Sequence, residues 1–184
     1  MRRLLPLLCG LLLAACGPRA ARPIDDFTLP VYTPRYASGF EITGAAGSRS
    51  TLLTVHNPWY GTEVADQRLF IARDGEEAPT GFEGEVLRGE ARRVVCMSGS
   101  YIAMLDALGA ADRVVGVSGA QYLMNETLRR RIVAGTAADV GFDSNVDFER
   151  LVALRPDLVM LFGIGGANTA LTGKLRELGI PYLY

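Results

Sequence analysis

From about residue 91 onwards, the sequence alternates short apolar runs with segments in which apolar residues recur every three or four positions. The apolar runs are at residues 93–97, 113–117, 138–141, 157–162 and 180–184, and the segments with helical spacing are at residues 101–108, 121–133, 147–154 and 168–178. Continuous apolar strands that alternate with amphipathic helices are typical of a parallel sheet with both faces covered by helices. The sequence therefore predicts an α/β fold with a Rossmann-like parallel sheet for residues 91–184.

Residues 31–90 have a different pattern, in which short β-type runs are separated by turn residues. Apolar and polar residues alternate at 40–43, β-branched residues are frequent at 50–56, and the run at 68–72 stops before Asp74-Gly75. Short strands between turn signals are typical of hairpins or a meander. We therefore predict a β-rich segment over residues 31–90, ahead of the α/β part.

The amino terminus has the composition of an export signal. Arg2 and Arg3 precede a mostly apolar run at residues 4–15. This run is shorter than the roughly 20 residues that a membrane-spanning helix needs. A short basic segment followed by a short apolar run is typical of a signal peptide. We therefore expect the chain to be exported from the cytoplasm.

The end of this signal resembles the lipobox of bacterial lipoproteins, in the sequence Leu13-Ala14-Ala15-Cys16. In that family the cysteine is acylated and the peptide is cut before it. The resemblance implies a signal peptide at residues 1–15 and a lipid on Cys16, and an ordinary secretory signal with a chance cysteine is the alternative. Residues 17–23 contain two prolines and no periodicity, so we expect a tether at residues 16–30.

Charge and cysteine content restrict the function further. Without residues 1–15 the chain has 17 Lys and Arg against 20 Asp and Glu, and no basic stripe is visible in the sequence. Nucleic-acid binding is therefore not expected. Cys9 would leave with the signal and Cys16 would carry lipid, so Cys96 alone remains and no intrachain disulfide is expected. Cys96 is in an apolar run and is interpreted as an inert core thiol.

Three segments of the α/β part resemble the amino-terminal lobe of periplasmic substrate-binding proteins for iron–siderophore complexes and vitamin B12. They are residues 93–117, residues 140–159 with Leu154-Arg155-Pro156-Asp157-Leu158-Val159, and residues 174–181 with Gly179-Ile180-Pro181. The resemblance implies a fold of two α/β lobes joined by a long helix, with the ligand clamped between them. It also implies a preceding β-rich part, which residues 33–42 and 57–59 resemble.

The chain ends at Tyr184, where members of this family continue into the connecting helix and the second lobe. We therefore expect residues 91–184 to be a truncated iron–siderophore and B12-type binding domain whose second lobe is missing from this sequence. A half-receptor is the alternative.

The candidate binding residues are in the loops that follow the predicted strands. In open parallel sheets, ligands bind beyond the carboxyl ends of the strands. These loops contain the only tryptophan and several other aromatic residues, and aromatic walls with a few polar anchors suit large flat or catecholate ligands. The candidate ligand-binding residues are Trp59, Tyr60, Ser98, Ser100, Tyr101, Gln121 and Phe142.

Several of these residues have a structural alternative. Trp59 could be a partly buried packing residue, and Tyr101 could be the first helical residue that faces the core. Ser98 and Ser100 are more often helix caps than ligand contacts. Backbone amides at that helix start could still bind an anionic group.

His56 is the only histidine, and no cysteine pair is present, so direct capture of a bare metal ion is not expected. No catalytic residues, resident metal or cofactor are predicted, and iron would arrive inside a chelator.

The leading hypothesis is a substrate-binding lipoprotein of an ABC importer. It would capture a ferric siderophore, or a heme- or cobalamin-type chelate, and deliver it to the ABC permease. We expect it to be lipid-anchored on the periplasmic or cell-surface face of a bacterial membrane. The alternatives are a surface lipoprotein with an enzymatic α/β domain, for which no G-x-S-x-G motif is found, and an adhesive or structural lipoprotein.

Overall fold

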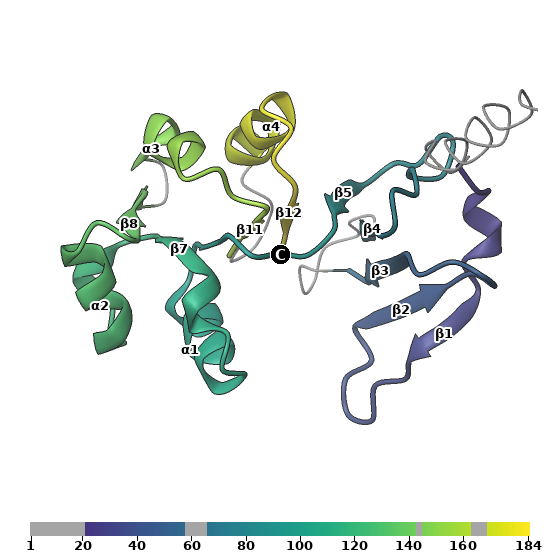
Figure 1. Ribbon diagram of the computed structural model, residues 1–184, viewed down its shortest axis with the longest axis horizontal. Coiled ribbons are helices and arrows are strands. Elements are labelled where there is room, and N and C mark those ends of the chain that lie inside the picture. Colours follow the sequence, from purple (N-terminus) through teal and green to yellow (C-terminus); the bar gives the residue numbers. More distant parts are fainter. Residues whose placement is uncertain (1–20, 58–65, 143–144, 163–168) are drawn as a thin grey trace, which may run out of the picture.

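The structure, a computed structural model, describes residues 21–57, 66–142, 145–162 and 169–184. These residues form two five-stranded sheets and a small two-stranded sheet. The second five-stranded sheet is covered by helices on both faces (Figure 1). In the described part of the chain, no helix is both long and apolar enough to cross a membrane.

The first sheet is the predicted β-rich segment, which the structure confirms. It contains, in spatial order, β1 (Leu29–Tyr32), β2 (Phe40–Gly44), β3 (Thr51–Val55), β4 (Gln67–Ala72) and β5 (Glu85–Arg88). The first four strands pair antiparallel, and β5 pairs parallel with β4. Its core is centred on Leu52 and Phe70, and the ring of Phe70 contacts that of Phe27 edge-on, with 5.3 Å between the centroids.

The folded part of the chain begins earlier than the sequence predicts. An extended tether is expected up to residue 30, but Ile24–Asp26 form a 3-10 helix (η1) and β1 begins at Leu29. Phe27 between them is only 5% exposed. Burial of a phenylalanine ring stabilises a fold by about 2 kcal/mol. This burial, together with the pairing of β1 with β2, orders a segment that has no periodic pattern of its own. The prediction of a tether is therefore wrong for residues 24–30.

The second sheet is entirely parallel, as predicted. Its strands are β6 (Val94–Cys96), β7 (Val114–Val117), β8 (Ala138–Asp139), β11 (Leu158–Met160) and β12 (Tyr182–Leu183), in the spatial order β12-β11-β6-β7-β8. The α-helices are α1 (Gly99–Ala107), α2 (Glu126–Val133), α3 (Phe148–Ala153) and α4 (Thr169–Glu177). Short 3-10 turns, η2 (Ala111–Arg113) and η3 (Ala120–Tyr122), precede and follow β7.

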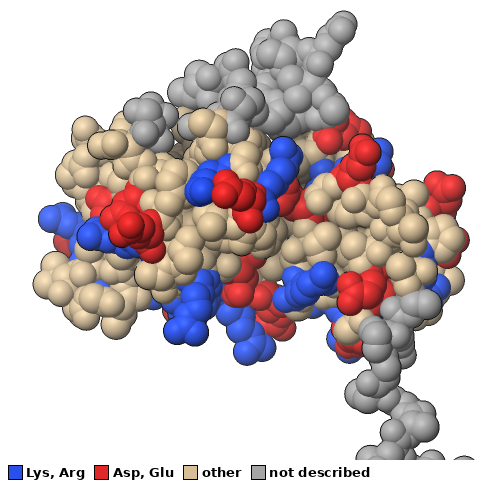
Figure 2. Space-filling model, turned by 90° about the horizontal axis from the view of Figure 1, so that it is seen from above, with Lys and Arg blue, Asp and Glu red and all other residues tan. Residues whose placement is uncertain are grey.

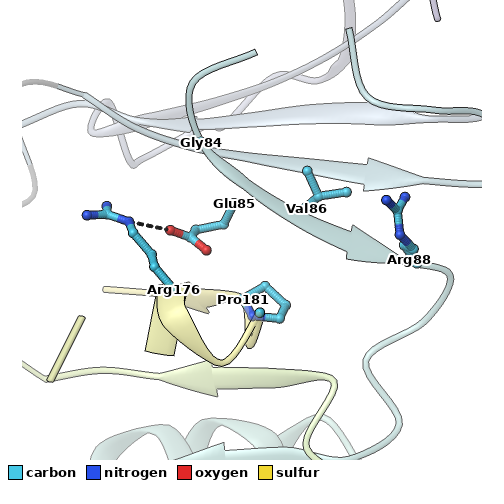
Figure 3. Close-up of a pocket in the computed structure, with 7 residues that line it drawn as sticks. Gly84, Glu85, Val86, Arg88, Arg176 and Pro181 are labelled. Carbon is cyan, nitrogen blue, oxygen red and sulfur yellow. Dashed lines mark hydrogen bonds and ion pairs between the residues drawn. The ribbon is translucent and has the colours of Figure 1, made fainter. Parts of the chain in front are cut away.

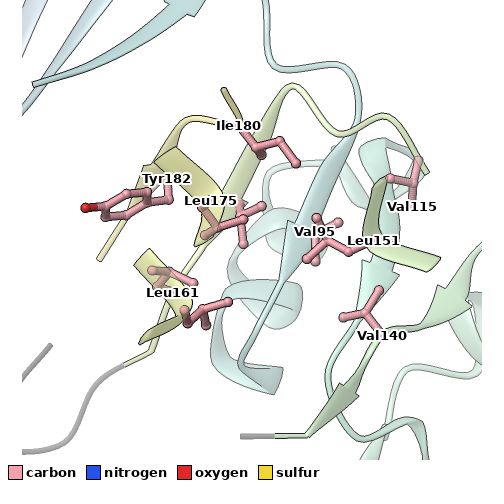
Figure 4. Packing of buried hydrophobic residues seen from close by; sticks show 10 residues of the cluster. Val95, Val115, Val140, Leu151, Leu161, Leu175, Ile180 and Tyr182 are labelled. Carbon is pink, nitrogen blue, oxygen red and sulfur yellow. The ribbon is translucent and has the colours of Figure 1, made fainter. Parts of the chain in front are cut away.

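The helices cover the parallel sheet in two layers, with α1 and α2 on one face and α3 and α4 on the other (Figure 1). Residues of β6 alternate between the two cores because successive side chains of a strand point to opposite faces. Val94 and Cys96 pack with Ile102 of α1, whereas Val95 packs with Leu175 of α4 (Figure 4). Both faces are therefore buried, which explains the continuous apolar runs in the sequence.

Two predicted elements are divided in the structure. The helix expected at 121–133 becomes η3 and α2, because the side chain of Asn125 caps α2 by accepting a hydrogen bond from the backbone N–H of Leu128 at 2.9 Å. The strand expected at 138–141 becomes β8 and a separate β9 (Gly141–Phe142), which pairs antiparallel with β10 (Asn145–Val146). Gly141 has a φ of +88°, which turns the chain out of the parallel sheet.

Candidate functional site

The strand order of the parallel sheet reverses at β6, which has β7 on one side and β11 on the other. The connections that leave β6 and β11 therefore run to opposite faces of the sheet, and the reversal point lies between the carboxyl ends of these two strands. Ligands of open parallel sheets bind at such a reversal point. Three of the predicted residues, Ser98, Ser100 and Tyr101, lie in the first connection.

Tyr101 joins the two strands at this reversal. Its hydroxyl donates a hydrogen bond to the backbone carbonyl of Leu161, just after β11, at 2.8 Å. Burial, with a smaller contribution from the nearby Cys96, raises the pKa of this hydroxyl, which keeps it a donor. Ser98 caps α1, because its hydroxyl accepts the backbone N–H of Ser100 at 3.3 Å. Ser100 itself is exposed.

We expect Tyr101→Phe to lower the free energy of unfolding by about 1 kcal/mol, because it leaves the Leu161 carbonyl without this donor. Tyr122→Phe is the matched control, since Tyr122 is 70% exposed and its hydroxyl can bond to water. Urea denaturation of both variants would measure the difference. Equal stability of the two variants would show that the Tyr101 hydroxyl does not stabilise the reversal point.

Asp139, at the carboxyl end of β8, holds the next two loops together. Its carboxylate accepts backbone N–H groups of Gly119 at 3.1 Å, Ala120 at 2.8 Å and Gly141 at 3.0 Å. Gly119 has a φ of +67°, which lets the chain turn sharply after β7. One side chain therefore sets the relative position of the loop after β7 and the loop after β8.

These two loops carry a pair of exposed aromatic rings. The rings of Tyr122 and Phe142 are 6.0 Å apart between centroids and inclined by 58°. Tyr122 is 70% exposed and Phe142 is 56% exposed, although each is a large apolar side chain. The predicted Gln121 is exposed beside Tyr122. The pair offers an aromatic surface to a flat ligand. Each aromatic pair formed between a ring and the ligand would contribute about 0.5–1.5 kcal/mol to binding.

The loop with the other two candidates starts and ends at the same edge of the molecule. Trp59 and Tyr60 themselves lie outside the described residues. The Nδ1 atom of His56, before this loop, is 3.0 Å from an oxygen of Asp66, after it. The side-chain amide of Gln67 donates to the carbonyl of Tyr182 at 3.2 Å and accepts the N–H of Tyr184 at 3.0 Å. These contacts hold the start of β4 beside the carboxyl end of β12.

The structure thus brings most of the predicted positions to one edge of the sheet. Two residues that define this edge are absent from the predicted set, namely Tyr122 and Asp139. Tyr122 lies in one of the loops that follow the predicted strands, and its aromatic ring is the sequence signal for it. Asp139 follows a short apolar strand and precedes a glycine, and its role depends on contacts with residues 19 and 20 positions earlier, which sequence spacing does not show.

The family model described as "Periplasmic binding protein" matches residues 94–183, which are the parallel sheet and its helices. Residues 94–183 belong to the periplasmic binding protein family. Among curated proteins, none matches this chain at a significant level.

Solved periplasmic binding proteins resemble about half of the chain. A periplasmic heme binding protein from Pseudomonas aeruginosa is 24% identical with a TM-score of 0.42, and the match covers 51% of this chain and 31% of that one. The periplasmic vitamin B12 binding protein of Vibrio cholerae is 24% identical with a TM-score of 0.39, and the match covers 50% of this chain and 33% of that one. The periplasmic heme binding protein of the same organism is 26% identical with a TM-score of 0.38, and the match covers 49% of this chain and 32% of that one. The chain spans about a third of the length of these structures, and the family assignment rests on the family match.

A separate cavity of about 330 Å³ lies where the β-rich sheet meets the periplasmic binding protein domain (Figure 3). The guanidinium of Arg176 donates to the carboxylate of Glu85 at 3.2 Å and lies 5.3 Å from the ring centroid of Tyr182. Burial raises the pKa of Glu85, and the hydrogen bond from Arg176 opposes this shift. The Glu85 carboxylate is thus paired with Arg176 and links β5 to α4. We interpret this cavity as part of the contact between the two sheets and not as a ligand site.

Within the described residues, no group of three His, Cys, Asp or Glu side chains is placed to hold a metal ion. Cys96 is fully buried in β6, as the sequence predicts, and burial raises the pKa of its thiol to about 12. The thiol therefore stays protonated and unreactive near neutral pH.

Proposed function

We propose that this periplasmic binding protein captures a metal chelate with a large flat organic face, of the heme, corrinoid or ferric siderophore class, for an ABC importer. The observation that carries the proposal is the exposed Tyr122–Phe142 pair at the carboxyl edge of the parallel sheet. Exposed aromatic rings on a rigid support are typical of sites for large apolar ligands. Ligand binding rather than catalysis agrees with the family match, which is to binding proteins.

The rest of the binding surface would come from the reversal point and from the loop after β3. Tyr101 would support the reversal point and Gln121 would supply a polar anchor. Trp59 and Tyr60, outside the described residues, stay predicted ligand contacts. Phe162, which follows β11 and is 54% exposed, would add a third described ring. In the family a second lobe closes over the ligand, so the surface described here would form one wall of the site.

We further propose that the chain works outside the cytoplasm, held by a lipid on Cys16 after removal of residues 1–15, with a permease of the ABC class as its partner. Residues 31–90 and 91–184 would form the two parts of one lobe. Mass spectrometry of the membrane fraction would test the anchor, and Cys16→Ala should prevent its attachment. An unmodified Cys16 in exported protein would contradict it.

Titration with hemin, cobalamin and a ferric hydroxamate tests the ligand class, with the fluorescence of the only tryptophan as the signal. The double variant Tyr122→Ala/Phe142→Ala should bind the preferred chelate about 10-fold to 30-fold more weakly, because two aromatic contacts are worth about 2 kcal/mol. Tyr36→Ala is the control, since Tyr36 is 89% exposed in the turn between β1 and β2, away from the pair. Equal affinities of the double variant and the control would contradict the proposal.

A further inference from the structure

The two edges of the parallel sheet differ in charge. At the amino edge, where the strands begin, Arg92 and Arg93 precede β6 and Arg113 precedes β7. The last turn of α2, which leads back to this edge, contains Arg130 and Arg131. Figure 2 shows several Lys and Arg side chains that project together from the lower edge of the molecule. The strands therefore begin at an edge that is rich in arginine.

A groove of about 500 Å³ at the start of β6 contains arginines and carboxylates together. Its arginines are Arg49, Arg73, Arg88 and Arg92. Asp74, Glu90 and Asp157 line the same groove and balance most of this charge. The sign of the charge is clearer at the carboxyl edge of the parallel sheet, where the ligand is proposed to bind.

The carboxyl edge has an excess of acidic side chains. At this edge each strand that precedes a helix is followed by a segment that ends with the first turn of that helix. By sequence, these segments are residues 97–102, 118–129, 139–151 and 161–172. Together they contain five carboxylates against two arginines, an excess of three negative charges. The segments around the proposed ligand surface are therefore acidic.

One of the two arginines is bound to its neighbours. The Arg150 guanidinium lies 3.5 Å from the carboxylate of Asp147 and donates to the backbone carbonyl of Asp139 at 3.1 Å. Glu126 and Glu149, in the first turns of α2 and α3, are exposed. Acidic side chains in a first turn stabilise a helix through its dipole, which explains their place. They also leave negative charge at the solvent-exposed carboxyl edge.

Several backbone N–H groups that could bind an anion at this edge are bonded to side chains of the chain itself. Helix starts and tight loops are the places where backbone N–H groups usually bind anions. Here the carboxylate of Asp139 accepts the N–H groups of Gly119, Ala120 and Gly141. Side chains also cap the starts of α2 and α3. The protein thus holds a carboxylate of its own where an anionic ligand group would find donors.

The start of α1 is a positive feature at the same edge. Its first turn has no acidic residue, and the Ser98 hydroxyl accepts only the N–H of Ser100. The start of a helix is equivalent to about half a positive elementary charge. This partial charge is small beside the excess of three carboxylates in the segments at this edge. An anionic ligand group near α1 would therefore still approach a negative edge.

We propose that the carboxyl edge selects a chelate without net negative charge, and that a cationic chelate binds more tightly than a neutral one. The inference rests on the proposed function and narrows its ligand class. Carboxylates beside the site repel an anionic ligand, whereas the exposed ring faces of Tyr122 and Phe142 attract a cation.

This charge rule separates the candidate ligand classes. Three hydroxamates cancel the charge of ferric iron, and cyanocobalamin is neutral. Three catecholates leave a ferric chelate anionic, and hemin carries two carboxylates. Hydroxamate and corrinoid chelates are therefore favoured over catecholate chelates and hemin.

The test compares the affinities of the full chain for matched chelates that differ mainly in charge. The pairs are cyanocobalamin and its monocarboxylic acid, hemin dimethyl ester and hemin, and ferrioxamine B acetylated or succinylated at its free amine. Unmodified ferrioxamine B is the cationic member. At low salt the less negative member of each pair should bind about fivefold more tightly, as expected for repulsion of one like charge. About 0.5 M salt should remove most of this difference, because exposed charges are screened.

Charge variants test the same inference from the side of the protein. Met124 is 89% exposed between η3 and α2, two positions after Tyr122. Met124→Lys should strengthen binding of the anionic members about fivefold and change that of the neutral members by less than about twofold. Met124→Gln, which adds no charge, should leave the preference unchanged.

Val133→Lys is the control for position. Val133 is 90% exposed at the other end of α2. The eight residues of α2 span about 12 Å, more than the Debye length of about 8 Å at physiological salt. The same added charge should therefore have little effect there.

Equal affinities within each pair at low salt, or tighter binding of the anionic member, would overturn the inference and leave the proposed function in place. A preference that high salt does not change would also overturn it, because its cause would then be shape and not charge. Equal effects of Met124→Lys and Val133→Lys would show that the preference does not come from the carboxyl edge. If no chelate of any pair binds, the proposed function is wrong and the inference is overturned with it.

Discussion

Gly141→Ala should lower the free energy of unfolding by about 3 kcal/mol or more. Gly141 has a φ of +88°, and a Cβ atom there would be 2.2 Å from the backbone oxygen of Asn145. An alanine in a left-handed conformation costs about 1–2 kcal/mol by itself. The contact with a backbone atom adds to this, because β9 and β10 would have to separate. The variant should also bind the chelate more weakly, since Phe142 follows directly.

Gly135→Ala separates the two contributions. Gly135 has a φ of +72°, but a Cβ atom there would have no neighbour within 4 Å. We expect it to cost only the conformational part, about 1 kcal/mol. Urea denaturation followed by circular dichroism would measure both variants. Equal losses of stability in the two would show that the Asn145 contact does not constrain Gly141.

Asp139→Ala should lower the free energy of unfolding by about 3 kcal/mol. The carboxylate accepts three backbone N–H groups, from Gly119, Ala120 and Gly141, and a hydrogen bond to a charged group contributes about 1.5–3 kcal/mol when buried. Partial exposure of Asp139 reduces the total below the sum of three such bonds. Because these bonds position the loops with Tyr122 and Phe142, chelate affinity should fall as well, with both rings unchanged.

Asp147→Ala is the matched control for this prediction. Asp147 is also a carboxylate that binds backbone, but it accepts a single backbone N–H, from Arg150 at the start of α3, at 2.9 Å. It also forms an exposed ion pair with the Arg150 side chain at 3.5 Å, and such pairs contribute little. Loss of a helix cap costs about 1 kcal/mol. Isothermal titration with the chelate and urea denaturation would be applied to both variants. Similar effects of the two changes on affinity would contradict the positioning role of Asp139.

The α/β part of the fold could be predicted because its cause is local. Val94-Val95-Cys96 and Leu158-Val159 are buried on both faces of the sheet, so each strand appears in the sequence as an unbroken apolar run. The predicted helix at residues 147–154 is also local in origin, because Asp147 caps α3 through a hydrogen bond to Arg150, only three positions away.

The start of the domain and part of the site could not be predicted in this way. Phe27 joins the core through Phe70, 43 positions later in the chain, so nothing near Phe27 in the sequence indicates its burial. Gly141 interrupts an apolar run that would otherwise be interpreted as one strand. Tyr122 and Phe142 form a pair only because Asp139 brings two loops together.

By itself, the sequence determined the class of fold, the division into a β-rich and an α/β part, and the edge of the sheet where the candidate residues gather. These features follow from the period of apolar residues and from the rule that all parallel strands end on one side. Only the tertiary structure decided which aromatic rings meet and where the arginines collect. Arg49, Arg73, Arg88 and Arg92 are far apart in an acidic chain with no basic stripe, and they line one groove because the ends of four strands meet there.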